Sequence, residues 1–355
     1  MTFDFKLPEQ LQALFPDYHT PNETSPYEYA KAQGVQYPNY TPWKMEPLEE
    51  IKDIEEKGKL ASKDKSSLLN AATSVRNITP LTGTEILGLS LAKLSDSQKN
   101  DLAKLAAERG VVVFRAQDDL DIREQVRFGS YFGPPHIHQE SGIIPDIPWV
   151  HAVYKDENSH KGLRSQVWHS DVPYELNSAG LTTLRFDTIP SQGGDTMFAN
   201  GYAIYESLNP GFRAYLETLS AVHSGYGQLS IAQSEGRTTR RPPLETVHPL
   251  VRTNPITGLK SLYISENFTT AIVGLEKKLS DVLLRYLFDY VNNALQFQVR
   301  LSWGKHDVAV WDNRSHFHTG VFDYYPEVRH GTRVIALANK AYFDPNSKLL
   351  SEYEG

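Results

Sequence analysis

The chain has 355 residues, a hydrophobic share of 40% and a formal net charge of -7, which suits one large domain with appendages or two ordinary domains and argues against nucleic acid or an anionic membrane as the main partner. It has no cysteine, so disulfide scaffolds and thiolate metal sites are excluded and any metal must be held by His, Asp or Glu. No apolar run approaches the roughly 18 residues of a membrane span, and the N-terminus lacks a secretory signal, so we expect a soluble, cytoplasmic protein.

Residues 1–80 differ from the rest of the chain, because prolines from Pro8 to Pro47 interrupt any long periodic pattern. Aromatic side chains are scattered among these prolines, whereas disordered segments are poor in aromatics. We therefore predict an N-terminal extension over residues 1–80 that lies over the core as an extended arm. The charged stretch 49–66 suggests a short exposed helix within it. Residues 81–355 then form the main domain.

Helix and strand signals become regular near residue 85. Ser95 and Gln98 have the form of a capping box, which predicts a helix that continues to Gly110, a residue type that commonly ends helices. Residues 111–114 form a run of Val and Phe that is typical of a buried strand. A second helix is predicted over residues 122–132, where apolar side chains recur at helical spacing and a Gly-Pro-Pro sequence follows.

From residue 150 onward, short strand-like runs alternate with turns. We predict a helix capped by Asn200, a helix over 280–293, and a hairpin around the turn 254–258. The polar stretch 224–243 is predicted to be a long loop of the kind that acts as a lid. The strands predicted here are 181–186, 247–251, 261–264, 297–303, 307–311 and 333–337. Many short strands with helices outside them predict a mainly β protein with flanking helices, of the sandwich or jelly-roll type.

The stretch Trp168-His169-Ser170-Asp171 contains a His-x-Asp pair. On a strand, residues i and i+2 point to the same face, so His169 and Asp171 can both reach one metal. A third ligand must come from elsewhere, and His318 lies just past the apolar strand that ends at Trp311. Two histidines and one carboxylate are the ligand set of a non-haem Fe(II) site that keeps coordination positions open. The chain has 12 histidines, so a His-x-Asp pair by itself is more simply explained as a histidine and an aspartate without a shared function.

Two arginines follow this histidine and make the combination more specific. Arg329 offers a planar fork that matches a carboxylate, as a site for the far carboxylate of 2-oxoglutarate requires. Arg333 lies four residues after Arg329 and would share a face with it on a strand, so a second anion could be held beside the first.

With these stretches the sequence resembles the Fe(II)/2-oxoglutarate-dependent dioxygenases of the taurine dioxygenase (TauD/TfdA-like) family, over about residues 82–345. The stretches that carry the resemblance are 168–171, 193–196, 248–251, 266–270 and 311–318. The resemblance implies a double-stranded β-helix, or jelly-roll, core with iron at its mouth. It implies His169, Asp171 and His318 as the Fe(II) ligands. Position within the motif favours His318 over His316, which we take as an ordinary polar or supporting residue.

The resemblance also implies where the small molecules bind. Arg329 would bind the distal carboxylate of 2-oxoglutarate, helped by the hydroxyl of Thr196. Arg333 and His138 match positions that contact a substrate sulfonate, and we assign Phe268 to the substrate site with them. The family match implies oxidation of an unactivated C–H bond by molecular oxygen, with succinate and carbon dioxide as co-products.

The chain also departs from taurine-using members of the family. Those members have Asn and Tyr where this chain has Ser165 and Ser141, so the amine of taurine would lose partners. A long N-terminal extension resembles the fungal sulfonate-dioxygenase-like members. The sequence therefore predicts a small anionic substrate that is alkylsulfonate- or taurine-like.

Two alternatives stay open. The first keeps the cofactor chemistry but acts on an amino acid or another carboxylate in natural-product biosynthesis, by hydroxylation, desaturation or cyclisation. The second is a metal-binding jelly roll without turnover. A homo-oligomer is compatible with either reading.

Overall fold

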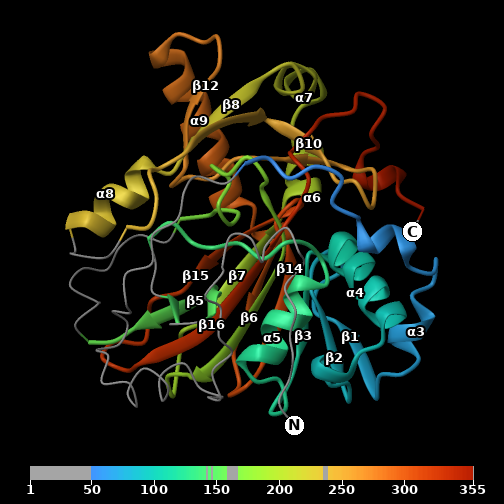
Figure 1. Ribbon diagram of the computed structural model, residues 1–355. Helices are drawn as coiled ribbons and strands as arrows, with labels where there is room; N and C mark the ends of the chain where they lie inside the picture. The colour runs from blue at the N-terminus through green and yellow to red at the C-terminus, as the bar shows by residue number, and fades with distance from the viewer. Residues whose placement is uncertain (1–48, 141–142, 145–146, 158–166, 235–238, 355) are drawn as a thin grey trace.

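The computed structural model describes residues 49–140, 143–144, 147–157, 167–234 and 239–354. A large sheet contains the strands β1 (Ser74–Asn77), β2 (Thr84–Leu87), β3 (Val111–Phe114), β4 (Ile143–Ile144), β5 (Ile147–Lys155), β6 (Ala179–Thr188), β14 (Val308–Asp312) and β16 (Arg329–Leu337). Their order across the sheet is β1-β2-β3-β14-β6-β16-β5-β4 (Figure 1). All neighbouring strands are antiparallel except β2 and β3, which are parallel.

A smaller antiparallel sheet faces the large one. Its strands are β7 (Thr196–Asn200), β13 (Gln298–Leu301) and β15 (His316–Gly320), in the order β13-β7-β15. A hydrophobic core joins the two sheets and consists of Val111, Val113, Leu184, Phe186, Phe198, Val299, Leu301, Ala309 and Trp311. Two facing sheets with a shared apolar interior form the jelly-roll core, so the predicted mainly β fold with flanking helices is confirmed.

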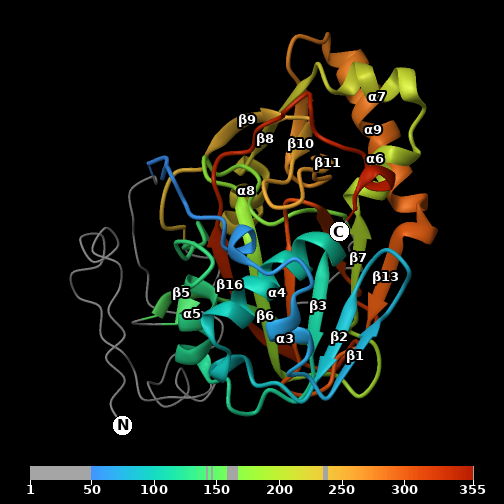
Figure 2. The same ribbon diagram turned by 90° about the vertical axis from the view of Figure 1, so that its right-hand side faces the viewer.

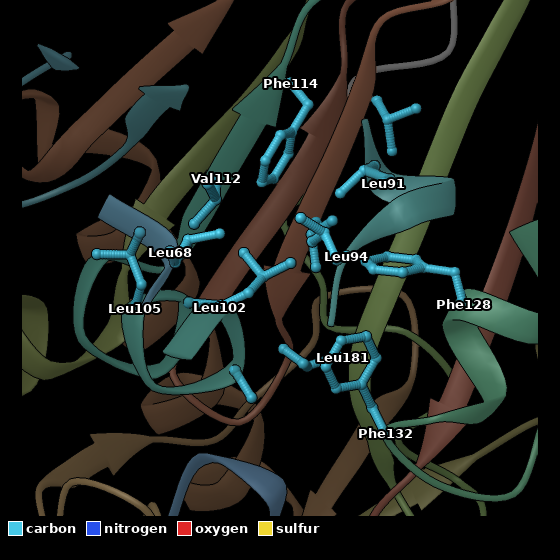
Figure 3. Packing of buried hydrophobic residues seen from close by; sticks show 14 of the residues in the cluster. Leu68, Leu91, Leu94, Leu102, Leu105, Val112, Phe114, Phe128, Phe132 and Leu181 are labelled. Carbon is cyan, nitrogen blue, oxygen red and sulfur yellow. The ribbon is translucent and has the colours of Figure 1, made fainter. Parts of the chain in front are cut away.

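Two helices, α4 (Asp96–Arg109) and α5 (Ile122–Ser130), cover the outer face of the large sheet (Figure 1). Leu102 and Leu105 of α4 pack in one cluster with Val112 and Phe114 of β3 (Figure 3). Alternate residues of a strand point to opposite faces, so the remaining β3 residues reach the inner core. This double burial explains why β3 is apolar at every position.

The ends of α4 follow the sequence prediction. The Ser95 side chain accepts from the backbone N–H of Gln98 at 3.3 Å, and the Gln98 side chain accepts from the backbone N–H of Ser95 at 2.9 Å. Gly110 ends the helix with φ +78°. A Cβ atom there would lie 2.1 Å from the ring of His316. Gly110 therefore both ends the helix and leaves room for an imidazole from β15.

The remaining elements gather at one end of the large sheet (Figures 1 and 2). They are α6 (Gly201–Ser207), α7 (Pro210–Leu216), β8 (Ser220–Ser224), α8 (Tyr226–Ser234), β9 (Glu245–Pro249), β10 (Val251–Thr253), β11 (Lys260–Leu262), β12 (Thr269–Ile272) and α9 (Lys277–Asn293). Asn200 caps α6 as predicted, by accepting from the N–H groups of Tyr202 and Ala203.

Three predictions about individual elements need correction. The predicted lid loop 224–243 contains helix α8, and after residues 235–238, which lie outside the described residues, Arg240 and Arg241 are buried. The hairpin pairs β10 with β11, whereas residues 247–249 belong to β9 and pair with β8. The predicted helix over 122–132 ends at Ser130.

The first 48 residues of the predicted extension lie outside the described residues. Three 3-10 turns, η2 (Leu91–Lys93), η3 (Leu295–Phe297) and η4 (Leu350–Glu352), complete the elements of the main domain. Where the sequence suggested a short exposed helix within residues 49–66, the chain makes the short 3-10 helix η1 (Lys57–Leu60), and α3 (Ser66–Leu69) follows. Buried Asp101 of α4 accepts from the backbone N–H of Ser62 at 3.0 Å and from that of Leu68 at 3.3 Å. Among the described residues, no helix has the length and apolar character to cross a membrane.

Candidate active site

His169 and Asp171 lie in the segment between β5 and β6, opposite strand β15. The backbone N–H of His169 donates to the carbonyl of His318 at 3.1 Å, and the N–H of His318 donates to the carbonyl of His169 at 2.7 Å. This isolated bridge holds the two histidines side by side. The prediction that His169 and Asp171 share a strand is wrong, because the segment is a loop in which Val172 has φ +40°. His318, predicted to lie just past a strand, is on β15.

The three predicted metal ligands come together. His169, Asp171 and His318 each offer one donor atom, and these atoms lie within 4.8 Å of one another. Nε2 of His318 is 3.7 Å from Oδ1 of Asp171. Nδ1 of His169 lies 3.1 Å from the carbonyl of Val167, so this nitrogen carries the proton and Nε2 keeps its lone pair. Among the described residues this is the one group of three side chains with such spacing.

Burial sets the charge of these ligands. It lowers the pKa of His318 to about 3 and also lowers the pKa of His169. Both imidazoles are therefore neutral near pH 7, the form that a metal requires. Burial raises the pKa of Asp171, but Arg333, the two imidazoles and the Thr182 hydroxyl together lower the pKa by more, so the carboxyl stays ionised. The site thus presents two neutral nitrogen donors and one carboxylate.

A shell of hydrogen bonds fixes Asp171. Its backbone N–H donates to Oδ1 of Asn313 at 2.9 Å, and its Oδ2 accepts from the Thr182 hydroxyl at 2.9 Å. The amide of Asn313 in turn donates to the Thr182 hydroxyl at 2.8 Å. Trp311 Nε1 completes the set by donating to Asn313 Oδ1 at 3.1 Å. The Trp-Asp-Asn-Arg stretch therefore orients the carboxylate, as metal sites require of their outer residues.

His316 does not join the group. Its Nδ1 lies 2.9 Å from the Ser315 hydroxyl and its Nε2 lies 3.4 Å from the Thr82 hydroxyl. Both of its nitrogens therefore lie beside hydroxyl groups, and neither belongs to the set of donor atoms that His169, Asp171 and His318 bring together. The structure thus groups His318, and not its neighbour, with His169 and Asp171.

Arg329 lies deep in the sheet, with 5% of its surface exposed. Its guanidinium packs over the ring of Phe186, 4.1 Å from the centroid, and Nη2 donates to the Thr196 hydroxyl at 3.0 Å. That hydroxyl also accepts from Trp303 Nε1 at 3.0 Å, so its own proton remains for a third partner. A Cβ at Gly331 would lie 2.7 Å from the Phe186 ring. Glycine there leaves space for the ring on which the guanidinium stacks.

No carboxylate of the described residues forms an ion pair with Arg329, and its buried Nε has no hydrogen-bond partner. Burial lowers the pKa of this guanidinium to about 10. A buried cation without an anion is costly, so the arrangement points to an anionic ligand. The predicted pair of Arg329 and Thr196 offers what the distal carboxylate of 2-oxoglutarate needs, a guanidinium edge and a hydroxyl donor.

Arg333 borders the metal-ligand group. Nη1 of Arg333 donates to Oδ1 of Asp171 at 2.5 Å, and its Nη2 lies 2.5 Å from Nδ1 of His151. The ring of His138 is 4.5 Å from that of His151 between centroids. Phe268 is buried and its ring lies 6.3 Å from that of His169. Arg333 and Phe268 therefore lie beside the ligand group, and His138 lies next to His151, the second partner of Arg333.

Sequence reasoning missed His151, because its part in this cluster depends on how β5 pairs with β16. No local motif signals that pairing. Ser141 and Ser165, where the chain departs from taurine-using members, lie outside the described residues.

The comparison with protein families decides the classification. A family model described as taurine catabolism dioxygenase TauD, TfdA family matches residues 74–335. This chain belongs to that family. It is accordingly an oxidoreductase that depends on Fe(II) and 2-oxoglutarate, which confirms the predicted enzyme class and cofactors. The two neutral imidazoles and the carboxylate described above fit Fe(II), and Arg329, which has no ion-pair partner among the described residues, fits a carboxylate of 2-oxoglutarate.

Individual relatives agree with this membership of the TauD/TfdA family. A Schizosaccharomyces pombe protein, named among the alpha-ketoglutarate-dependent sulfonate dioxygenases, is 39% identical over 306 residues, which cover 84% of this chain and 78% of the relative. The alpha-ketoglutarate-dependent sulfonate dioxygenase of Saccharomyces cerevisiae is 36% identical over 280 residues, covering 76% and 68%. A taurine dioxygenase structure from Burkholderia xenovorans superposes with a TM-score of 0.65 at 29% identity, covering 78% of this chain and 92% of that one.

Proposed function

We propose that this TauD/TfdA-family enzyme oxidises an unactivated C–H bond of a small alkylsulfonate. The observation that carries the proposal is the 2.5 Å contact of Arg333 with Asp171. A guanidinium in that position can hold an anion directly beside the metal ligands. The names of the two yeast relatives, both sulfonate dioxygenases, support a sulfonate as that anion.

In this proposal His169, Asp171 and His318 hold Fe(II) through two nitrogens and one oxygen. Three protein ligands leave positions open for other molecules. The bound iron and 2-oxoglutarate supply the oxidising power, with succinate and carbon dioxide released from the co-substrate. The contribution of the protein is to keep both imidazoles neutral and the carboxylate oriented. Asn313 and Thr182 do the orienting, through the hydrogen bonds to Asp171.

Arg329 and Thr196 are the proposed contacts of the distal carboxylate of 2-oxoglutarate. Both side chains are buried, which strengthens each charge-assisted hydrogen bond by excluding water. Because Thr196 accepts two hydrogen bonds from the protein, its hydroxyl proton can point only toward the remaining partner. The Arg329 charge gains an anion only when co-substrate is bound.

Arg333 and His138 are the proposed contacts of the substrate sulfonate, and Phe268 is the proposed apolar wall beside it. Burial holds the pKa of His138 well below its ordinary value, so the ring is neutral. Its Nδ1 accepts from the backbone N–H of Glu140 at 3.4 Å, which leaves the proton on Nε2 as a donor. Hydroxylation of the carbon that bears the sulfonate gives an adduct that breaks its C–S bond, leaving an aldehyde and sulfite.

The test is a panel of alkylsulfonates and matched alkylcarboxylates, each incubated with Fe(II)-loaded enzyme, 2-oxoglutarate and oxygen. Sulfite and succinate are measured together. The proposal expects one sulfite for each succinate with at least one sulfonate. Succinate formed with carboxylates, and no sulfite from any sulfonate, would transfer the proposal to the carboxylate class. A cytoplasmic location and a homo-oligomeric state stay predictions.

A further inference from the structure

His151 and Arg333 are cross-strand neighbours in the large sheet. In the antiparallel pair of β5 and β16, His151 is the residue directly opposite Arg333. On the other flank, β6 places Leu184 opposite Arg333. Side chains directly opposite each other lie on the same face. His151 is therefore the polar side chain that flanks Arg333 along this row of the sheet, since leucine offers no hydrogen bond.

The contact between the two side chains has a defined direction. Nη2 of Arg333 lies 2.5 Å from Nδ1 of His151, and a guanidinium can only donate, so Nδ1 accepts. Nη1 donates to Asp171 at 2.5 Å. The two terminal nitrogens thus donate to two different residues, Asp171 and His151, and these two bonds fix the plane of the guanidinium. Nε of Arg333 is buried and has no protein partner among the described residues. One N–H on each terminal nitrogen also remains after these two bonds.

His151 also packs against the second group assigned to the substrate anion. Its ring lies 4.5 Å from the ring of His138, tilted by 47°. It therefore contacts both proposed sulfonate contacts at once, although it lies on a different strand from Arg333 and outside the loop of His138.

We propose that His151 is a positioning residue for the substrate anion. It holds the guanidinium of Arg333 in its binding orientation before substrate arrives, so less freedom is lost on binding. This inference rests on the proposed function, because it takes Arg333 as the sulfonate contact. It predicts an effect on substrate affinity and none on 2-oxoglutarate, since Arg329 contacts Thr196 and Phe186 instead.

The test compares two variants with different chemistry. His151→Leu replaces the imidazole with an apolar side chain of similar reach and so removes the acceptor. His151→Asn instead places an acceptor oxygen near the position of Nδ1. Binding of butane-1-sulfonate to Mn(II)- and 2-oxoglutarate-loaded protein is measured by calorimetry, together with KM and kcat of the Fe(II) enzyme for that sulfonate. We expect His151→Leu to raise Kd and KM about tenfold, the loss of one charge-assisted hydrogen bond. His151→Asn is expected within about threefold of wild type, and KM for 2-oxoglutarate is unchanged in both.

Arg333→Leu separates failure of this inference from failure of the proposed function. If Arg333→Leu loses sulfonate binding while His151→Leu matches wild type, the role of His151 is overturned and the proposed site stands. Equal losses in His151→Leu and His151→Asn also overturn it, because a hydrogen-bond acceptor would not matter. If wild type and Arg333→Leu bind butane-1-sulfonate equally, or neither binds it, the proposed sulfonate site fails and this inference fails with it. Thermal denaturation of each variant verifies that it is folded.

Discussion

Two buried arginines, Arg314 and Arg329, lie close in the sequence and have opposite surroundings. Arg314 donates from Nε and Nη2 to the two carboxylate oxygens of Asp312, each at 2.8 Å, and Nη1 contacts Glu56. Burial lowers the pKa of Arg314, but Asp312 and Glu56 raise it by more, so the net change is upward. Arg329 has a hydroxyl and an aromatic ring as partners, and burial lowers its pKa to about 10.

The contrast separates residues that complete the fold from residues that need a ligand. The carboxylates of Asp312 and Glu56 neutralise Arg314, so the charge of this cluster is balanced within the protein and no ligand is needed. Arg329 lacks such a partner among the described residues. The histidines His316 and His318 differ in the same way. Both nitrogens of His316 lie near hydroxyl groups. In the part of the chain that the structure describes, Nδ1 of His318 has no hydrogen-bond partner, and its Nε2 faces Asp171. Arg314 and His316 thus have partners within the protein, whereas His318 and Arg329 carry the binding roles that we propose.

The largest expected effect tests the histidine pair. His318→Ala should abolish succinate formation and lower bound iron, because one of three ligands is removed. His316→Ala is the matched control and should keep its iron, although it loses stability through its contacts with Ser315 and Thr82. Iron content and succinate formation are measured for both. Retention of iron by His318→Ala with loss of iron from His316→Ala would reverse the assignment.

Removing a carboxylate from the Arg314 cluster is expected to cause a large loss of stability. Asp312→Ala removes the bidentate partner of Arg314 and leaves a buried guanidinium with Glu56 alone. The free energy of unfolding should fall by about 3–5 kcal/mol, as for other broken buried ion pairs. Urea denaturation measures it. A loss below about 1 kcal/mol would mean that the cluster does not stabilise the fold.

A smaller effect is expected at Thr196. Thr196→Val removes the hydroxyl and keeps the shape of the side chain, so the 2-oxoglutarate concentration for half-maximal rate should rise about tenfold, the value of one hydrogen bond of about 1.4 kcal/mol. Thr196→Ser keeps the hydroxyl and should stay near wild type. Steady-state succinate formation over a range of 2-oxoglutarate concentrations measures both. If Thr196→Val and Thr196→Ser need the same 2-oxoglutarate concentration for half-maximal rate, the Thr196 hydroxyl does not bind the co-substrate.

Elements with local signals could be predicted from the sequence. The capping box of Ser95 and Gln98 and the stop at Gly110 depend on neighbouring residues, and both are confirmed. Helix α8 was mistaken for a loop, because its Gly-, Ser- and Gln-rich start lacks a clear apolar stripe. The residues of the proposed site were predicted from the resemblance of their motifs to a known family rather than from their secondary structure.

Contacts between distant parts of the chain could not be predicted. Glu56 contacts Arg314 across more than half of the sequence, and His151 contacts Arg333 only because β5 pairs with β16 in one register. A shift of that register by one residue would turn His151 to the other face. Pattern reasoning from one sequence does not fix the register between strands so far apart, so these partners required the structure.

The central claim is that the charge of Arg329 serves a ligand and not the fold. The most direct measurement is calorimetric titration of 2-oxoglutarate into the Mn(II)-loaded wild-type protein and the Arg329→Gln variant, with urea denaturation of both proteins without 2-oxoglutarate. We expect about 100-fold weaker 2-oxoglutarate binding in Arg329→Gln, because the bonds to a charged partner are lost. Stability without co-substrate should be unchanged or higher, since a buried unpaired charge is removed. Unchanged 2-oxoglutarate affinity together with a large loss of stability would contradict the claim.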